Sequence, residues 1–401
     1  MLDLEEALAR ILAAMPALRG ERVCLTNAHG RVLTEPVVSP MDLPMFDNSA
    51  MDGYAVRAED VALAKPDSPA RLRLAGKIAA GETFKGHVTA GTCVRLFTGA
   101  ALPAGADAVV MQEDTRAAES ERGEIQVLDS VKPWESVRLR GEDVKRGALL
   151  ADVGDVLTIG KLNLLAATGC AEVSVGCQPV VGLLSTGSEL REPGQTLAPG
   201  QIYESNRLGL AELVRRAGGI PRILPLVPDT LAETRRAVAE TLDQCDLIVS
   251  SGGVSVGEMD FAKQAFEEIG GDLQFWKVAI KPGRPFVFGR RQAKFWFGLP
   301  GNPVSALVTF LLLVRPALLR WQGAKEINLP SYPGVLAEPL SNPGERRHFM
   351  RVKVDAAGKI DSAGLQASHA LSSMAAANGL VDVLPRTTLP AGTQVQVMRW
   401  E

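Results

Sequence analysis

Residues 246–260 read DLIVSSGGVSVGEMD and run directly into a helical pattern, FAKQAFEEIG, at residues 261–270. The first stretch starts as a short apolar run, breaks into paired glycines and ends with two carboxylates, Glu258 and Asp260. A buried strand, a glycine-rich turn and a helix in this order are typical of one repeat of an α/β sheet. The stretch therefore indicates both a fold class and a place where a ligand would bind.

The same alternation extends on both sides of this stretch. Strand-like and helical segments follow one another from about residue 177 to residue 322, which predicts a doubly wound, mostly parallel sheet covered by helices. The strand-like segments are PVVGLLSTG (179–187), IPRILPLV (220–227) and DLIVSSGG (246–253). A hairpin-like segment at 276–300 and a buried apolar helix, VSALVTFLLLV (304–314), close this domain.

The remaining sequence predicts three further domains, so the expected fold class is multidomain α/β plus β. An amphipathic helix and proline-punctuated segments at 1–44, together with 142–176, predict a discontinuous mixed domain. Short apolar runs between Gly, Pro and Asp turns at 45–141 predict a small inserted β-rich domain. Similar alternation predicts a C-terminal β domain at 323–401, after the α/β domain at 177–322.

The composition is that of a folded protein with several domains. The chain has 401 residues, of which 46% are hydrophobic, and a formal net charge of −3. This charge gives no field that would attract nucleic acid or an anionic membrane, so we expect neither as a partner. Five widely spaced cysteines without a CxxC pair, and an acidic N-terminal helix without signal-peptide features, predict a reducing cytoplasmic location.

Three carboxylates are expected at the carboxyl ends of the parallel strands, where open α/β sheets bind ligands: Glu189, Asp229 and Asp260. Two of them also have a structural interpretation. Thr230 and Glu233 form a capping-box pattern, and Asp229 favours the start of the same helix. Asp260 is placed to cap the helix that follows it. Acids at three consecutive strand ends nevertheless also predict a site for a hard cation such as Mg²⁺.

The glycine-rich loop GGVSVG at 252–257 lets the main chain approach a ligand closely and turns successive N–H groups toward an anion. It lacks the lysine of a Walker A loop and the GxGxxG of a dinucleotide fold, so kinase-like and NAD-dependent chemistry is not expected. Acids in place of the lysine would repel a phosphate unless a divalent cation bridged the two groups. The loop thus predicts a nucleotide or pyrophosphate held through Mg²⁺.

Positive charge follows on the next predicted strand, WKVAIKPGRP at 276–285. A two-residue period puts Lys277 and Lys281 on one face, with Arg284 beyond the turn, and these cations are candidates to hold an oxyanion. A solvated edge strand protected by lysines explains the same pattern. The following LPGNPVSA adds a rigid turn before a helix with Ser305 in its first turn, an anion-binding geometry that favours the oxyanion.

The other polar motifs give no independent site. The segments around Asp52, Thr98 and Asp143 have the composition of ordinary turns. The four histidines lack the i, i+4 pairing of zinc hydrolases and the acidic neighbour of a nucleophilic triad.

Seven motifs in register resemble the bacterial molybdopterin molybdenumtransferases, a family related to the C-terminal domain of gephyrin. The resemblance spans nearly the whole chain. The motifs are NSAMDGYA (48–55), FTGAALPAGADAVV (97–110), RGEDV (140–144), STGSEL (185–190), SSGGVSVGEMD (250–260), KVAIKPGRP (277–285) and LPGNPVSA (299–306).

This resemblance implies an activity and partners. The family is known for inserting molybdate into adenylyl-molybdopterin, with release of AMP and with Mg²⁺, and its members are elongated homodimers. The chain is therefore expected to be a transferase with adenylyl-molybdopterin and molybdate as substrates. A second copy of the chain and other molybdenum cofactor biosynthesis proteins are its candidate partners.

The resemblance also implies roles for individual residues. The nucleotide end would be held through Mg²⁺ by Glu189, Asp229 and Asp260, with Asp229 assisting pyrophosphate cleavage, beside a loop that contributes Ser251, Gly252, Gly253, Ser255 and Gly257. The oxyanion and its surroundings would contact Lys277, Lys281, Arg284, Pro300, Asn302, Pro303, Ser305, Arg351, Ser372 and Ser373. The partner subunit would contribute Asp52, Thr98 and Asp143.

Two other functions are open at the level of sequence. A nucleotide pyrophosphatase of related α/β fold would cleave the anhydride without molybdate, and the set of cations argues against it. A non-catalytic scaffold would bind a peptide in a crevice between domains, and the intact acids and lysines argue against that.

Overall fold

The computed structural model describes residues 1–117, 123–253 and 261–400. The chain forms two compact units. Unit 1 comprises Met1–Glu35, Val153–Thr158 and Glu172–Glu401, and unit 2 comprises Pro36–Asp152 and Ile159–Ala171. The finer division into four domains stays a prediction.

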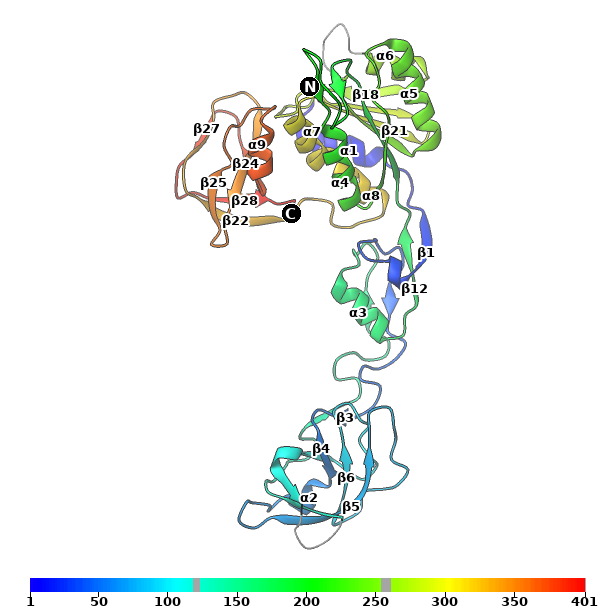
Figure 1. Ribbon diagram of the computed structural model, residues 1–401, viewed down its shortest axis with the longest axis vertical. Coiled ribbons are helices and arrows are strands. Elements are labelled where there is room, and N and C mark those ends of the chain that lie inside the picture. Colours follow the sequence, from blue (N-terminus) through cyan, green and yellow to red (C-terminus); the bar gives the residue numbers. More distant parts are fainter. Residues whose placement is uncertain (118–122, 254–260, 401) are drawn as a thin grey trace. The chain divides into compact units, whose positions relative to one another are not determined.

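A six-stranded sheet, the α/β sheet, lies at the centre of one part of unit 1 (Figure 1). Its strands, in spatial order, are β16 (Ile220–Ile223), β13 (Val180–Ser185), β17 (Leu247–Ser251), β21 (Lys294–Leu299), β20 (Val287–Arg291) and β18 (Asp272–Trp276). The first four are parallel, and β20 is antiparallel to both of its neighbours. The mostly parallel sheet expected from the alternation is thus confirmed, and the hairpin is formed by β20 and β21.

Helices cover both faces of this sheet, as Figure 1 shows. One face packs against α1 (Leu4–Ala14), α4 (Asn206–Arg216), α7 (Pro303–Thr309), the π-helix η3 (Phe310–Val314) and α8 (Arg315–Trp321). The other face packs against α5 (Leu231–Gln244) and α6 (Ala262–Glu268). Successive side chains of a strand point to opposite faces, so Val249 joins the first core and Ile248 the second. Burial on both faces explains why the central strands β13, β17 and β21 are almost continuously apolar.

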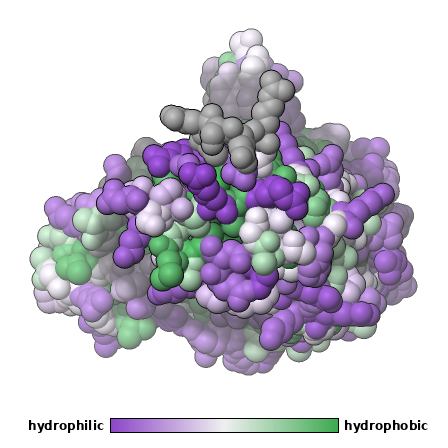
Figure 2. All heavy atoms as spheres, turned by 90° about the horizontal axis from the view of Figure 1, so that it is seen from below, coloured by the Kyte–Doolittle hydropathy of each residue, from purple (hydrophilic) through white to green (hydrophobic). Residues whose placement is uncertain are grey.

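The long helix from Pro303 to Trp321 is a core helix of unit 1. Its length and apolar composition alone would suffice to cross a membrane, but 78% of it is buried inside the protein. This burial agrees with the buried helix expected from VSALVTFLLLV. On the face of the molecule seen in Figure 2, hydrophilic residues predominate and hydrophobic residues form small separate patches.

The C-terminal region of unit 1 forms a second six-stranded sheet, the C-terminal sheet, as its alternating sequence predicts. In spatial order its strands are β19 (Ile280–Lys281), β24 (Arg347–Val354), β25 (Lys359–Ser362), β22 (Ser331–Leu336), β28 (Gln394–Met398) and β26 (Gly379–Val383), and β24 also pairs with β26.

Smaller elements of unit 1 are α9 (Leu371–Ala376) and the strand pairs β23 (Leu340–Asn342) with β27 (Thr387–Leu389), β1 (Gly20–Cys24) with β12 (Glu172–Gly176), and β14 (Leu190–Arg191) with β15 (Ile202–Tyr203).

Unit 2 contains a third six-stranded sheet. Its strands, in spatial order, are β7 (Ala108–Met111), β4 (Gly53–Val56), β6 (Thr92–Leu96), β5 (Ala70–Ile78), β9 (Glu124–Val127) and β8 (Thr115–Ala117). Separate apolar cores pack on its two faces, with Val56 in one and Ala55 in the other. The unit also contains α2 (Ala58–Val61), α3 (Ile159–Ala167), and the strand pairs β2 (Val37–Val38) with β11 (Leu149–Ala151) and β3 (Asn48–Ser49) with β10 (Val137–Arg138).

Candidate active site

A cavity of about 620 Å³ lies where β13, β17 and β21 end, and we call it the rim cavity. It lies outside the carboxyl ends of the parallel strands, the position at which open α/β sheets bind ligands. Seven of the residues predicted from the sequence line it: Glu189, Ser251, Gly252, Gly253, Pro300, Asn302 and Pro303. Its lining also includes Tyr203, Glu204, Asn206 and His369.

The described start of the glycine-rich loop requires glycine. Gly252 has a φ of +84°, and a Cβ atom at this position would lie 2.9 Å from the carbonyl oxygen of Thr186. Gly253 follows with a φ of +69°, a conformation that L side chains rarely adopt. The main chain of the loop therefore lies close to the end of β13. The predicted residues Ser255, Gly257 and Asp260 lie outside the described residues.

The two described acids of the predicted metal set differ in their contacts. Glu189 lines the rim cavity and is exposed. Asp229 holds the loop next to it, because its Oδ2 accepts a hydrogen bond from the Ser188 N–H (2.9 Å) and its own N–H donates to Ser188 Oγ (3.1 Å). The predicted helix cap is Thr230, whose Oγ1 accepts a hydrogen bond from the Glu233 N–H at 3.3 Å. Asp229 therefore positions the Glu189 loop rather than capping the helix.

The described part of the chain contains no group of three His, Cys, Asp or Glu side chains that could hold a metal ion. Mg²⁺ often takes only one or two protein carboxylates, and waters and substrate phosphates complete its six oxygen ligands. Glu189 supplies one such carboxylate to the lining of the rim cavity, whereas Asp229 is bonded to the neighbouring Ser188 and does not line that cavity. Asp260, the third predicted ligand, is among the residues that are not described.

A second cavity, of about 570 Å³, adjoins the rim cavity, since Pro285, Pro300 and Asn302 line both. We call it the cationic cavity because three positively charged side chains line it, together with the hydroxyl-bearing Ser305 and Ser368: Lys281, Arg284 and Arg346. In residues 1–117, 123–253 and 261–400, none of these three cations forms an ion pair with a carboxylate. Like charges held together without acids are unfavourable unless an anion binds among them.

The chain reaches the cationic cavity by leaving the α/β sheet at Trp276. The predicted continuous strand through Lys277 and Lys281 is wrong, because Lys277 has a φ of +75° and turns the chain. The next strand, β19, joins the C-terminal sheet, where Lys281 lies in register with His348 of β24. Lys277 lines neither cavity, and its ammonium group lies 3.5 Å from the centroid of the Trp276 ring.

Arg346 enters the cationic cavity from the other side, just before β24. Its Nη1 donates a hydrogen bond to the carbonyl oxygen of Ile280 at 2.8 Å, which fixes the guanidinium beside Lys281. Burial, and then the charge of Arg284, lower the pKa of Arg346. Sequence reasoning did not select Arg346, because the chain distance between residues 281 and 346 hides their pairing across β19 and β24.

Arg351, which the resemblance implied as an oxyanion ligand, is fully buried and does not line the cationic cavity. Its Nε donates a hydrogen bond to Ser373 Oγ at 2.8 Å, and its Nη2 donates to the carbonyl oxygen of Leu365 at 2.8 Å. Its Nη1 is buried without a hydrogen-bond partner in the described residues, and burial lowers its pKa. Of the two predicted serines, Ser373 is buried against Arg351 and Ser372 is exposed.

His348 is buried behind the cationic cavity, and neither of its ring nitrogens has a hydrogen-bond partner within the described residues. Burial lowers the pKa of His348 to about 4, and the neighbouring charges of Lys281, Arg351 and Arg346 act in the same direction. The imidazole is therefore neutral near pH 7 and adds no further positive charge to this region.

The predicted residues of unit 2 include one bonded pair. Asp52 Oδ1 accepts hydrogen bonds from the N–H and the Oγ1 of Thr98, both at 2.8 Å. These bonds, and the charge of Arg95, hold the pKa of Asp52 below its usual value. Arg95 also stacks over the Tyr54 ring, 4.8 Å from its centroid. Asp143 is exposed.

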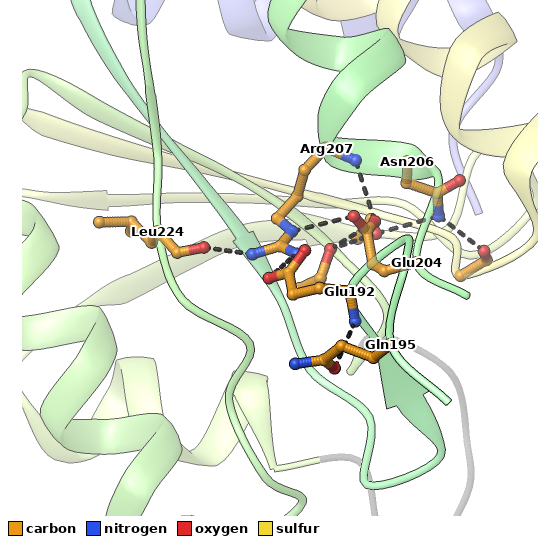
Figure 3. Close-up of polar contacts among 9 residues, drawn as sticks. Glu192, Gln195, Glu204, Asn206, Arg207 and Leu224 are labelled. Carbon is orange, nitrogen blue, oxygen red and sulfur yellow. Dashed lines mark hydrogen bonds and ion pairs between the residues drawn. The ribbon is translucent and has the colours of Figure 1, made fainter. Parts of the chain in front are cut away.

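A buried polar network beside the rim cavity was missed by sequence reasoning. It is built from YESNR at 203–207, which reads simply as a helix start (Figure 3). Asn206 donates through Nδ2 to Ser251 Oγ (3.0 Å) and to the carbonyl oxygen of Gly301 (2.8 Å). Ser205, at the N-cap position of α4, makes no capping hydrogen bond through its side chain.

Comparisons with known proteins agree with this arrangement. Three family models match the chain: the MoeA N-terminal region (domain I and II) over residues 2–169, a probable molybdopterin binding domain over residues 182–320, and the MoeA C-terminal region (domain IV) over residues 333–400. The crystal structure of the molybdopterin biosynthesis moeA protein from Pyrococcus horikoshii OT3 is similar, with a TM-score of 0.82, 30% identity and full coverage of both chains. The fold and the site therefore define a protein of molybdenum cofactor biosynthesis.

Curated relatives define the family more closely. The molybdopterin molybdenumtransferase of Haemophilus influenzae is 40% identical over 94% of this chain and 93% of its own. Molybdopterin molybdenumtransferase 2 of Mycobacterium tuberculosis is 40% identical over 99% of both chains. The chain belongs to the molybdopterin molybdenumtransferase family and is a transferase.

Proposed function

We propose that this protein inserts molybdenum from molybdate into adenylyl-molybdopterin in the cytoplasm, with release of AMP and with dependence on Mg²⁺. The observation that carries the proposal is the adjacency of two cavities of opposite character. The rim cavity has a carboxylate and the first two glycines of the glycine-rich loop. The cationic cavity has three cations that pair with no acid in the part of the chain that the structure describes, and Pro285, Pro300 and Asn302 line both cavities.

The nucleotide end of the substrate would occupy the rim cavity. Gly252 and Gly253 allow the main chain to approach a phosphate closely. Glu189 and Asp229, with Asp260, would hold Mg²⁺, which neutralises phosphate charge when bound. Asp229 would also keep the Glu189 loop in place during cleavage of the pyrophosphate. Its carboxylate accepts a hydrogen bond from the Ser188 N–H, and its own N–H donates to Ser188 Oγ.

Molybdate, a tetrahedral dianion, would occupy the cationic cavity among Lys281, Arg284 and Arg346, with Ser305 beside it. Fixed cations aimed at an oxyanion stabilise developing negative charge without reorganising, which is the main way such sites accelerate a reaction. Arg351 and Ser373 would support the cavity wall from behind through their buried hydrogen bond. No protein nucleophile is required.

The active protein is proposed to be a homodimer in which unit 2 of one copy contributes residues to the active site of the other. Asp52, Thr98 and Asp143 would act from that position. The Asp52–Thr98 pair supports this role, because its hydrogen bonds keep an exposed carboxylate charged and fixed in one orientation.

One assay tests the proposal against its alternatives. Purified protein is incubated with adenylyl-molybdopterin, Mg²⁺ and molybdate, and both AMP and active molybdenum cofactor are measured. The proposal predicts AMP release that depends on molybdate and matches cofactor formation. Release of AMP without molybdate would instead support a nucleotide pyrophosphatase, and absence of turnover would support a scaffold.

A further inference from the structure

Arg207 lies at the start of α4, is 3% exposed and joins three separate segments of unit 1. Its Nε donates to Glu204 Oε2 at 2.9 Å and its Nη2 donates to Glu192 Oε1 at 2.8 Å. Its Nη1 donates to the carbonyl oxygen of Leu224, just beyond β16. Figure 3 shows the guanidinium between these three groups, which together with Arg207 we call the Arg207 network.

The Arg207 network closes the chain excursion that carries Glu189. After β13 the chain leaves the α/β sheet, forms the parallel pair β14–β15 and returns at Glu204. Glu192 directly follows β14 and Glu204 directly follows β15, so one guanidinium holds the same end of both strands. Glu189 lies immediately before β14, and its carbonyl oxygen accepts a hydrogen bond from the Ile202 N–H at 3.0 Å.

A second set of bonds connects the Arg207 network to the glycine-rich loop. Ser185 Oγ donates to Glu204 Oε1 at 3.1 Å and lies 3.1 Å from Ser251 Oγ. Ser251 is the residue directly before Gly252, and Asn206 also donates to it at 3.0 Å. The excursion that carries Glu189 and the start of the glycine-rich loop are therefore fixed by one continuous set of buried and partly buried polar contacts.

The chemistry of the contacts suits positioning better than simple stabilisation of the core. A planar guanidinium holds its two carboxylates and its carbonyl partner in fixed directions as well as at fixed distances, whereas the three donors of a lysine ammonium rotate freely and set no such directions. A small displacement of a group that binds substrate can cost about 100-fold in rate. Of the partners of Arg207, Glu204 lines the rim cavity, Glu192 lies two residues beyond Leu190 of its lining, and Leu224 lies just beyond β16.

We propose that Arg207 is a positioning residue that holds Glu189 at the fixed distance from Gly252, at the start of the glycine-rich loop, that is needed to bind the nucleotide end of the substrate. This proposal rests on the function proposed above. It requires that loss of the guanidinium weaken binding of the adenylated substrate and leave the KM for molybdate unchanged, because no residue of the Arg207 network lines the cationic cavity.

The test compares Arg207→Met, Arg207→Lys and a matched control, Arg215→Met. Arg215 lies on the same helix, is exposed and pairs with the exposed Glu212 at 3.2 Å. For Arg207→Met we expect a KM for adenylyl-molybdopterin raised at least tenfold, an unchanged KM for molybdate, and faster amide hydrogen exchange in residues 186–204 but not in β17. Arg207→Lys should recover part of the loss, because it keeps the charge beside Glu204. Arg215→Met should match the wild type.

Several outcomes would overturn the proposal. One is an Arg207→Met protein whose two KM values equal those of the wild type, or whose exchange rises equally in β17 and in residues 186–204. If Arg207→Met does not fold, Glu192→Gln takes its place, since it removes one contact at the more exposed end of the network. The same selective KM change, at smaller size, is then expected, and its absence overturns the proposal. A wild-type protein without turnover refutes the proposed function itself, which is a different result.

Discussion

The rim cavity and the cationic cavity share part of their walls, yet their charged groups are arranged in opposite ways. Beside the rim cavity, Arg207 pairs with Glu192 and Glu204, and the Asp229 carboxylate accepts a hydrogen bond from the Ser188 N–H, while Glu189 lines the cavity as an exposed acid. In the cationic cavity, the lining cations have no carboxylate partners within the described residues. Paired buried charges fix loops in place, whereas unpaired charges of one sign are arranged to receive a ligand of the other sign.

This difference separates residues that bind from residues that position. Loss of an unpaired cation should weaken binding of the ligand and leave folding intact. Loss of one member of a buried pair should leave its partner desolvated and uncompensated, which affects stability as well. The predictions below test this separation.

The largest effect is expected for Lys281→Ala. Lys281 is exposed and has no ion-pair partner among the described residues, so its loss should reduce kcat/KM for molybdate about 100-fold through lost electrostatic stabilisation. The melting temperature should not fall. Steady-state kinetics with varied molybdate measure the effect, and Lys359→Ala, which removes an exposed lysine from the C-terminal sheet, is the control. Equal losses in the two variants would contradict a local role for Lys281.

Glu189→Gln tests the rim cavity. The change removes an exposed carboxylate from the rim cavity, so the apparent affinity for Mg²⁺ should fall by about tenfold or more. The KM for molybdate should stay unchanged. Titration of AMP release with Mg²⁺ measures the effect, with Glu212→Gln on the exposed side of α4 as a control. A Mg²⁺ dependence equal to that of the wild type would remove Glu189 from the metal site.

The adjacent serines of α9 provide an internal comparison. Ser373→Ala leaves the buried Nε of Arg351 without its acceptor, so the free energy of unfolding should fall by about 2 kcal/mol. Ser372 is exposed, and Ser372→Ala should change it by less than about 0.5 kcal/mol. Denaturant unfolding measures both. Equal values for the two variants would show that the Arg351–Ser373 bond does not support the cavity wall.

The last prediction concerns the acid stability of the protein. The pKa of His348 is about 4 in the folded chain and near 6.5 when unfolded, so only the unfolded state takes up this proton as the pH falls below 6.5. His348 therefore contributes a loss of stability between pH 6.5 and 4, with a slope of at most about 1.4 kcal/mol per pH unit. His348→Gln should show a smaller loss over this range in denaturant titrations. An identical loss would mean that His348 is not held neutral.

Much of the fold could be predicted because its signals are local. Apolar runs of strand length alternate with helical spacing, and a strand buried on both faces can hardly be read otherwise. The break at Lys277 could not be predicted, because a positive φ at a non-glycine residue depends on tertiary contacts rather than on propensity. The alternating pattern of side chains continues through Lys277 in the sequence, but the strand itself ends at Trp276.

The candidate site was predictable where it uses residues that are unusual in their sequence context, such as Gly252 in a glycine-rich turn and Lys281 in a strand-like segment. Arg346 was not selected, because its place beside Lys281 depends on the pairing of β19 with β24, two segments far apart in the chain. Arg207 was not selected either, since an arginine near a helix start is usually exposed and here it is buried by a loop excursion. Long-range pairing and burial decide both cases, and neither has a local sequence signal.

Equilibrium binding of molybdate to the purified protein tests the central claim most directly, because it needs neither turnover nor the second substrate. Dialysis of wild type, Lys281→Ala and Lys359→Ala against molybdate at fixed ionic strength should show equal binding for the wild type and Lys359→Ala. Binding to Lys281→Ala should be at least tenfold weaker. Equal affinities in all three proteins would place the oxyanion outside the cationic cavity and contradict the account.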